Sequence, residues 1–572
     1  MALLRLFAVL LAAALSPIAA VTPIATRSEL GREHLVSQRS LSKRFIDENG
    51  HYNLSFYHIN DVHAHLDEFS SSGTDCSQKE KGCRGGYARV RQVLQDTRPD
   101  HPDSLFLNAG DEFQGTMFFT KYGGEKIAET LNQMDFDAMT LGNHEWDRGD
   151  EYLGEFLDNL TFPVISANVI SKNPALNSTI KPFQIFEQYQ LAVIGATTAE
   201  TADISSVDRD VTSFADVTKS VQDAIDLIRS TTNITRIVAL THIGYEEDMR
   251  LAQETTGLHL IIGGHSHTKL GSAEDAEGSY PTIVKNKDGE EVFVVTAWRW
   301  GEYLGYIDVT YDHDGRILEY HGAPIHLTNQ TKQEPELQRQ IDQWRAPFEE
   351  EMARVVGHSN VVLDQTTCQL QECLLGDFIA DAMVASRPKS NTPTFALMNA
   401  GGVRATIDAG EITLGEVLTA FPFGNSIVEI MISGEQLWTT LEGIVSKVSQ
   451  VNGKPITSFV QVSREMIIEY DPTADVGKRL LSVTIEDAPL DRSIQYRMIT
   501  IDFIAKGGDN FFSPAFPTPT TLKLLDEALV DHIVALSPID AALDGRIKTG
   551  KRTKCKRGGQ RAGTRRKARH QQ

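Results

Sequence analysis

Long apolar runs and common nucleotide-hydrolase motifs are scarce in this sequence. Beyond residues 6–15, no stretch holds the eighteen or so apolar residues that a membrane-spanning helix needs. The chain has no glycine-rich loop ending in lysine and a hydroxyl residue, and no serine placed between glycines at a nucleophile elbow. The sequence therefore excludes a P-loop nucleotide hydrolase and a serine hydrolase, and it predicts no membrane span in the mature chain.

Basic residues are in deficit over most of the chain. The sequence has 55 Lys and Arg against 77 Asp and Glu, which gives a net charge of -22. Residues 551–572 nevertheless hold ten Lys or Arg and no acidic residue, so the remainder is more acidic still. An acidic body repels phosphate backbones, which excludes a nucleic-acid binder. We interpret the basic tail, residues 549–572, as a solvated disordered segment, with binding of acidic glycans as the alternative.

The N-terminus predicts export. Arg5, the apolar residues 6–15 and the small residues Ala19 and Ala20 are typical of a signal peptide, residues 1–20. Residues 21–50 form a leader, in which Lys43-Arg44 is a candidate processing site. The C-terminus has no hydrophobic segment for a lipid-anchor signal. We expect a secreted, extracellular glycoprotein, and five sequons agree with it: Asn53, Asn159, Asn177, Asn233 and Asn329.

Cysteine is rare, with five in the chain. Cys76 and Cys83 form one close pair, and Cys368 and Cys373 form another. In an oxidising compartment each pair can close a short loop as a disulfide. Cys555 is left over, either free or linking two chains, so the oligomeric state stays open.

Strand-like and helix-like runs alternate through the first half of the chain. Such alternation predicts a layered α/β domain with buried sheets, which we place at residues 51–332. The runs are residues 54–59, 87–96, 104–108, 124–134, 138–141, 164–169, 191–197, 217–230, 236–241 and 258–262.

An amphipathic helix is predicted at residues 333–356, between two domains. Its apolar residues recur at intervals of three and four, with Pro347 as a kink. They are Leu337, Ile341, Trp344, Phe348, Met352 and Val355. Residues 357–548 then predict a second, α+β domain, with helices at 373–386 and 434–445 and strands at 466–470 and 496–501.

Side chains suited to metal binding follow several predicted strands. Ligands gather at the carboxyl ends of strands in α/β folds. Alternation along a strand would place Asp61 and His63 on one face, where both reach one ion. The oxygen and imidazole set, without thiolate, suits Zn, Mn or Fe, and it is too large for one tetrahedral ion. We expect two ions sharing a carboxylate, held among Asp61, His63, Asp111, Asn143, His242, His265 and His267.

Two divalent ions beside two aspartates leave a site that attracts a phosphate dianion. Paired ions roughly 3.5–4 Å apart activate a water for in-line attack and stabilise the equatorial oxygens, so we predict hydrolysis of phosphoesters or phosphoanhydrides. His144 would stabilise phosphoryl charge and help protonate the leaving oxygen, and Asp147 would orient it. The alternative for Asp147 is a helix cap.

These residues, in this order, resemble the calcineurin-like metallophosphoesterases, and the chain up to about residue 548 is similar to the 5'-nucleotidase family. The N-terminal motifs are Asn60-Asp61-Val62-His63, Gly110-Asp111, Gly142-Asn143-His144-Glu145 and Gly264-His265-Ser266-His267. The C-terminal motifs are Asn399-Ala400-Gly401-Gly402-Val403-Arg404, Phe421-Pro422-Phe423-Gly424 and Gly507-Gly508-Asp509.

The resemblance implies a four-layer α/β/β/α metallophosphoesterase domain, a linker helix that serves as a hinge, and a C-terminal nucleotide-binding domain. It assigns one ion to Asp61, His63, Asp111 and His267, and a second to Asp111, Asn143, His242 and His265. The cofactor prediction is two divalent ions, zinc first, with Ca, Mn or Mg as alternatives.

The resemblance also implies how a nucleotide is held. Phe423 and Phe503 would clamp the base, because stacking tolerates different bases. Asp509 would accept the ribose hydroxyl groups, with Asn399 and Arg404 nearby. Without the motifs, both phenylalanines would be interpreted as core residues.

Three positions depart from the membrane-anchored vertebrate type of the family. His65 and Gln369 stand where that type carries arginines facing the nucleotide, and Arg464 stands where glycine is usual. The missing positive charge argues against AMP-specific hydrolysis. Together with the missing anchor, it makes the chain resemble the secreted apyrases of blood-feeding arthropods.

The sequence thus predicts a secreted two-metal ectonucleotidase that removes phosphate from ATP and ADP. The first alternative is a soluble 5'-nucleotidase that converts AMP to adenosine. An alternative of another class is a catalytically inactive nucleotide scavenger or surface-binding protein. The intact metal and dyad positions argue against this inactive protein.

Overall fold

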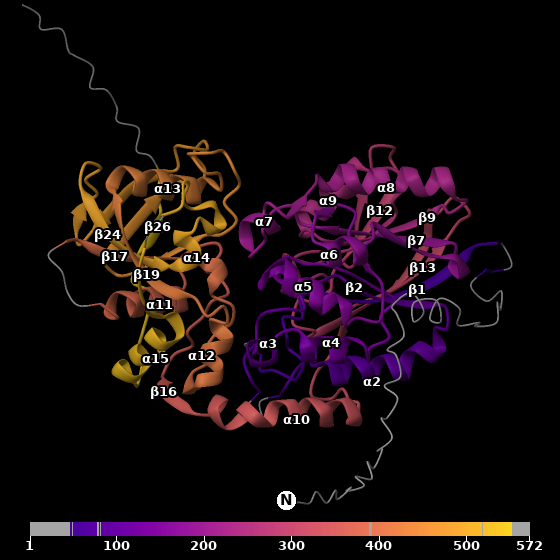
Figure 1. Cartoon of the computed structure of the whole chain (residues 1–572), viewed down its shortest axis with the longest axis horizontal. Helices are drawn as coiled ribbons and strands as arrows, with labels where there is room; N and C mark the ends of the chain where they lie inside the picture. The colour runs from indigo at the N-terminus through magenta and orange to yellow at the C-terminus, as the bar shows by residue number, and fades with distance from the viewer. Residues whose placement is uncertain are drawn as a thin grey trace, which may run out of the picture. The chain divides into compact units, whose positions relative to one another are not determined.

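A computed structural model of the chain describes residues 46–47, 50–71, 73–76, 79, 82–387, 392–516 and 519–551 (Figure 1). The predicted signal peptide, most of the leader, Cys555 and residues 552–572 of the basic tail lie outside this set. None of the helices within these ranges combines the length and apolarity needed to cross a bilayer.

The N-terminal domain contains two large sheets. The first has the order β14-β13-β1-β2-β3-β4, with β15 also paired to β13. Strands β1 to β4 run parallel, and β13 joins antiparallel to β1. Their bounds are β1 (Tyr52–Ile59), β2 (Ser104–Asn108), β3 (Ala138–Thr140), β4 (Val164–Ile165), β13 (Tyr303–Tyr311), β14 (Ile317–Gly322) and β15 (Ile325–His326).

The second sheet has the order β11-β12-β10-β9-β7-β6, with β7, β9, β10 and β12 parallel. Its strands are β6 (Phe183–Phe186), β7 (Leu191–Thr197), β9 (Arg236–His242), β10 (Leu260–Ile262), β11 (Thr282–Lys285) and β12 (Glu291–Val295). The run 164–169, predicted as one strand, is divided: β4 ends at Ile165, and β5 (Val169–Ser171) pairs with β8 (Thr212–Phe214) in a small sheet of its own. Asn168 turns the chain there, because its side chain bonds to the backbone of Thr197.

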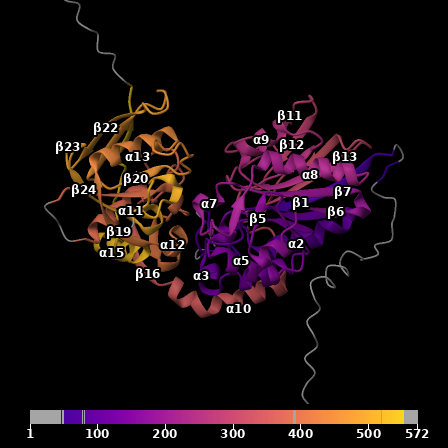
Figure 2. The same cartoon turned by 45° about the horizontal axis from the view of Figure 1, so that its top comes forward.

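The two sheets are stacked and covered by helices. Phe56 belongs to the core between the sheets, whereas its neighbour Tyr57 packs on the helices outside, as alternation along a strand requires. Helices α8 and α9 cover the outer face of the second sheet beside β7 and β12 (Figures 1 and 2). The helices are α2 (Tyr87–Thr97), α3 (Met117–Tyr122), α4 (Glu125–Leu131), α5 (Gly149–Asp158), α6 (Pro174–Thr179), α7 (Thr201–Ile204), α8 (Val217–Thr231) and α9 (Tyr245–Glu254). The predicted four-layer α/β/β/α arrangement is confirmed.

Helix α10 (Pro335–Met352) follows, capped by the Glu334 side chain. Its apolar face, including Ile341 and Phe348, packs into the core of the N-terminal domain. The helix runs through Pro347 to Met352. The sequence prediction extended it to Val355, which is wrong, because Val355 pairs with Thr413 and starts strand β16.

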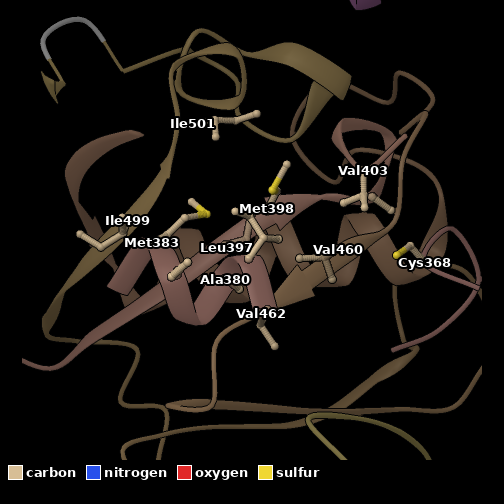
Figure 3. Close-up of a cluster of buried hydrophobic side chains, with 14 of the residues drawn as sticks. Cys368, Ala380, Met383, Leu397, Met398, Val403, Val460, Val462, Ile499 and Ile501 are labelled. Carbon is tan, nitrogen blue, oxygen red and sulfur yellow. The ribbon is translucent and has the colours of Figure 1, made fainter. Parts of the chain in front are cut away.

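The C-terminal domain is α+β, as predicted. Its larger sheet has the order β20-β17-β24-β19-β25, and the smaller ones are β23-β22-β21-β26 and β16-β18. Leu397 and Met398 of β17 and Met383 of α11 lie in its core (Figure 3). The strands are β16 (Val355–Ser359), β17 (Thr394–Asn399), β18 (Gly410–Thr413), β19 (Ser426–Ser433), β20 (Val460–Val462), β21 (Met466–Tyr470), β22 (Leu480–Ile485), β23 (Ala488–Pro489), β24 (Gln495–Ile501), β25 (Thr520–Leu524) and β26 (Ile547–Thr549). The helices are α11 (Leu374–Ala385), α12 (Leu414–Ala420), α13 (Gly434–Ser446), α14 (Asp502–Ala505) and α15 (Leu525–Leu536).

Both predicted disulfides are present. Cys76 is bonded to Cys83, and Cys368 to Cys373. All four cysteines are buried. The second bridge closes the loop directly before α11.

Candidate active site

The predicted metal-type residues come together at the carboxyl ends of five strands. Strand β1 leads to Asp61 and His63, β2 to Asp111, β3 to Asn143, β9 ends at His242, and β10 leads to His265 and His267. Strands β1, β2 and β3 are parallel in the first sheet and β9 and β10 in the second, so within each sheet these ends lie at the same edge. These residues form three groups, and within each group the ligand atoms lie within 4.8 Å of one another. The groups are Asp61, His63 and His267; His63, Asp111 and His144; and Asp111, His242 and His265.

The prediction that strand alternation places Asp61 and His63 on one face is wrong. Strand β1 ends at Ile59, so Asp61 and His63 are not on one face of a strand. Both residues have a positive φ of 51°, in the left-handed region that residues other than glycine rarely adopt. Asp111 (59°) and His267 (50°) share this conformation. Left-handed backbone in loops, not strand alternation, directs these side chains toward one point.

Asp111 lies between the two halves of the cluster. Its Oδ2 is 3.0 Å from Nε2 of His242 and 3.9 Å from Nε2 of His63. The Oδ1 atom accepts a hydrogen bond from the backbone N–H of His144 at 2.8 Å. This position fits the predicted role of Asp111 as a carboxylate shared by two ions.

The other half of the cluster brings two histidine nitrogens and a carboxylate close together. The Nε2 atoms of His63 and His267 are 2.9 Å apart, and Nε2 of His267 is 3.4 Å from Oδ1 of Asp61. Burial holds the pKa of His267 at about 4, although Asp61 opposes it, and burial also holds the pKa of His265 at about 3. Neutral imidazoles that face each other beside a carboxylate fit a cation between them.

Two further atoms complete the test of fit. Oδ1 of Asn143 is buried and has no hydrogen-bond partner among the described residues, and Nε2 of His242 faces Oδ2 of Asp111. Nδ1 of His242 lies 2.7 Å from the carbonyl of Ala109, which places the ring proton there and leaves Nε2 as a ligand. Burial lowers the pKa of His242, but Asp111 and Asp61 outweigh it and raise the pKa to about 10. The site attracts positive charge, so a pair of divalent ions fits these residues.

His144 and Asp147 form the expected dyad. Nδ1 of His144 is 2.8 Å from Oδ2 of Asp147, within the short 3-10 turn η4 (His144–Trp146) and its cap. Burial lowers the pKa of His144, but Asp147 and then Asp111 outweigh it, so the net effect is a raised pKa. A histidine protonated near neutral pH is suited to charge stabilisation and proton donation.

Replacing Asp147 by asparagine should shift the pH profile of kcat. If the protonated imidazole is the active form, activity falls as the pH rises through the raised pKa of His144. Asparagine removes the carboxylate that chiefly raises this pKa, so the alkaline limb should move to lower pH. The pH dependence of kcat for both proteins checks this. An unmoved limb would contradict the pairing, and Asp158→Asn, an exposed residue at the end of α5, is the control.

Glu145 is a site residue that the sequence analysis quoted only as part of a motif. Its carboxylate is fully buried and accepts four backbone hydrogen bonds. Oε2 accepts from the N–H of Asp111 (3.0 Å) and Gly142 (2.6 Å), and Oε1 from that of Glu112 (2.7 Å) and Phe113 (3.3 Å). Glu145 thereby ties the loop after β2 to the loop after β3.

The predicted substrate residues lie in the C-terminal domain. The two carboxylate oxygens of Asp509 accept from Nδ2 of Asn399 (2.7 Å) and from the hydroxyl of Thr457 (2.8 Å). Thr457 was not predicted, and its sequence surroundings gave no signal for it. Asp509 has a φ of 54°, so it too is directed by left-handed backbone.

Arg404 and Phe423 reach the residues of the metal cluster. A terminal nitrogen of Arg404 is 3.3 Å from Nε2 of His63. The ring of Phe423 stacks on that of His144, with centroids 5.8 Å apart. Phe503 packs partly buried against the domain core, and its ring leaves no room for a Cβ on Gly508.

None of the three departing positions offers a free cation to a nucleotide. Both ring nitrogens of His65 face backbone carbonyls, those of Val62 and Gly73 among them. Gln369 uses its amide oxygen to accept from the N–H of Phe459. Arg464 is ion-paired with Asp381.

Comparison with known proteins identifies the family. Residues 54–269 match the calcineurin-like phosphoesterase model, and residues 355–517 match that of the 5'-nucleotidase C-terminal domain. The chain is 32% identical to the snake venom 5'-nucleotidase of Naja atra, over 87% of this chain and 99% of that one. It is 31% identical to the 5'-nucleotidase of Homo sapiens, over 88% and 92%. A solved 5'-nucleotidase precursor from Thermus thermophilus matches with a TM-score of 0.79 at 33% identity, over 87% and 99%.

Calcineurin-like phosphoesterases use a dinuclear metal centre, and the clusters around Asp111 supply candidate ligands for one. The resemblance inferred from the motifs is therefore confirmed in both domains. The chain belongs to the 5'-nucleotidase family and is a metal-dependent nucleotide phosphohydrolase.

Proposed function

We propose that this chain is a secreted apyrase-type ectonucleotidase, which removes the terminal phosphate of extracellular ATP and ADP. The observation that supports this specificity is the use of His65 and Gln369. The ring nitrogens of His65 face backbone carbonyls, and the neutral amide of Gln369 accepts from the N–H of Phe459. Neither residue supplies the positive charge that an AMP-specific site of this family is expected to place there.

Asp61, His63, Asp111 and His267 would hold one divalent ion, and Asp111, Asn143, His242 and His265 the other. When bound, the two ions activate the attacking water and neutralise charge on the reacting phosphate. The donor set suits zinc first, with calcium, manganese and magnesium as alternatives.

The chain's own residues do the rest. His144, held by Asp147, donates a hydrogen bond to the phosphate and a proton toward the leaving oxygen. Arg404 supplies a fixed charge beside His63. Phe423 and Phe503 bind the base by stacking, and Asp509, oriented by Asn399, accepts the ribose hydroxyls.

A soluble 5'-nucleotidase acting on AMP is the second candidate. The names of the relatives from Naja atra and Homo sapiens favour it, and it would use the same residues. An inactive scavenger is disfavoured, because the dyad and the candidate ligands are all present.

Export is supported by the signal peptide prediction and by the surface. The asparagines of all five sequons are exposed, so each is accessible to glycosylation. A snake venom protein is among the relatives, which agrees with secretion. The role of the basic tail remains a prediction: deletion of residues 551–572 should weaken retention on heparin if the tail binds acidic glycans.

The function is tested by phosphate release from ATP, ADP and AMP separately. We expect phosphate release from ATP and ADP, with accumulation of AMP. Phosphate release should be lost on chelation and should recover when one divalent metal at a time is restored. Release mainly from AMP would instead establish the 5'-nucleotidase candidate. No release from any of the three, with metal bound, would favour the scavenger.

A further inference from the structure

The loop between β12 and β13 carries an arginine, Arg299, that belongs to none of the sequence motifs. Arg299 lies between Trp298 and Trp300, and the backbone on both sides of it is bonded to the loop of Asp61. The carbonyl of Trp298 accepts from Nδ2 of Asn60 at 2.7 Å, and the N–H of Trp300 donates to the carbonyl of Asp61 at 2.6 Å. Arg299 is thus fixed to the segment that carries a candidate metal ligand.

The backbone at this point is held in an uncommon conformation. Trp298 has a φ of 65° and Trp300 a φ of 60°, both in the left-handed region. Bulky side chains rarely adopt it, and it persists where surrounding contacts impose it, often at functional sites. Here the imposed geometry presents the side chain between the two tryptophans.

The guanidinium of Arg299 lies close to two tryptophan rings, and one of its nitrogens has no hydrogen-bond acceptor among the described residues. Its central carbon lies 3.9 Å from the ring centroid of Trp300 and 5.4 Å from that of Trp298. Its Nε is buried with no acceptor among the described residues. Glu302, the nearest acid along the chain, is bound by Arg84 and His326. An arginine that lies against aromatic rings and keeps a buried N–H without an acceptor is suited to an anionic ligand.

Arg299 lies next to the active site through Trp300. Trp300, whose ring contacts the guanidinium, lines a small cavity with His63, His65 and Arg404. Burial and then the charge of Arg404 lower the pKa of Arg299 to about 10, against the opposing influence of Glu302, Asp61 and Glu277. A bound anion near Arg299 and Arg404 would offset this repulsion.

We infer that Arg299 is a specificity-determining residue that binds the phosphate next to the reacting one in nucleoside di- and triphosphates. The inference rests on the proposed function, because AMP has no second phosphate. It gives the site a charge in place of those missing at His65 and Gln369.

The chemistry that Arg299 would assist is displacement at the terminal phosphorus. The water oxygen forms a bond to this phosphorus, and the bond from phosphorus to the bridging oxygen breaks. The electron pair stays on the bridging oxygen of the leaving nucleotide, which takes the proton of His144. One water proton remains on the released phosphate, and the other restores the proton of His144. Arg299 stabilises the charge that develops on the leaving phosphate.

The test compares Arg299→Gln with wild type, using inorganic pyrophosphate and orthophosphate as competitive inhibitors under saturating metal. We expect the inhibition constant of pyrophosphate to rise about 10- to 100-fold, as for loss of a charged hydrogen bond, and that of orthophosphate to change less than about threefold. Arg299→Lys should lose part of the effect, because lysine keeps the charge without the planar stacking. Arg250→Gln, an exposed arginine on α9, is the matched control.

Each other outcome overturns the inference. Equal weakening of both inhibitors would mean that Arg299 acts on the reacting phosphate or only on the fold, and thermal unfolding of the variant separates these two. No change, or a wild type that binds pyrophosphate no better than orthophosphate, would mean that no second phosphate is bound. If wild type cleaves only AMP, the proposed specificity fails. The inhibition constant of pyrophosphate against AMP cleavage would still show whether Arg299 binds a second phosphate.

Discussion

Replacing His144 by asparagine is expected to lower kcat by ~10²–10⁴, the range for loss of a general acid. The imidazole is the only group of the dyad that can carry a proton to the leaving oxygen, and Asp147 at 2.8 Å keeps it charged. Asparagine retains the backbone N–H that donates to Asp111, so the loop is preserved. Steady-state kinetics with the substrate that wild type prefers measures the loss.

Metal content decides between two roles for His144. A nitrogen of His144 lies near enough to His63 and Asp111 to be a third ligand. If His144 is the acid of the dyad, as we propose, the asparagine variant keeps two ions per chain. Loss of one ion would instead place His144 among the ligands and explain the lost activity without proton transfer. His313→Asn, an exposed histidine of the same domain, controls for histidine loss as such.

The sequence predicted the position of the site better than its local geometry. The strand runs before Asp61, Asp111 and His242 were recognisable, and the rule for strand ends in α/β sheets then brings their carboxyl ends together. The left-handed backbone at Asp61 and His63 was not predictable, because neither residue type demands a positive φ. Tertiary contacts impose it.

Site residues that bind backbone groups could not be predicted, because such contacts leave no pattern in the sequence. Glu145 bonds to four N–H groups, and every residue except proline has one. Thr457 acts only by orienting Asp509, from a loop with no periodicity. In the C-terminal domain, Phe423 and Phe503 were assigned through the resemblance to a family, since composition alone favours a core role for both.

The end of α10 shows a different limit. The apolar spacing continues to Val355, but the helix stops at Met352 because the next residues pair with β18. Sheet pairing between residues far apart in the chain is a non-local interaction, so the local pattern could not reveal it.

Replacing Glu145 by glutamine should weaken metal binding about 10- to 100-fold, the usual effect of losing a partner that orients ligands. The two carboxylate oxygens each accept from two backbone N–H groups. Glutamine has one oxygen and one NH2 group, so in either orientation one pair of N–H groups faces a donor. Each buried group left unpaired costs about 1–3 kcal/mol, so the melting temperature should fall as well.

The expected consequence is a defect that metal can partly reverse. Asp111 is carried on the loop that Glu145 holds, and Asn143 follows Gly142, whose N–H Glu145 also binds. A loosened loop would still contain every ligand, so kcat should recover at high metal concentration while the apparent dissociation constant for metal stays raised. Titration of the apoprotein with zinc measures that constant directly. Glu151→Gln, exposed on α5, should leave it unchanged. If Glu145→Gln binds metal normally but has lost activity, then Glu145 acts on the chemistry itself, and its hydrogen bonds to the two loops are not what holds the ligands in place.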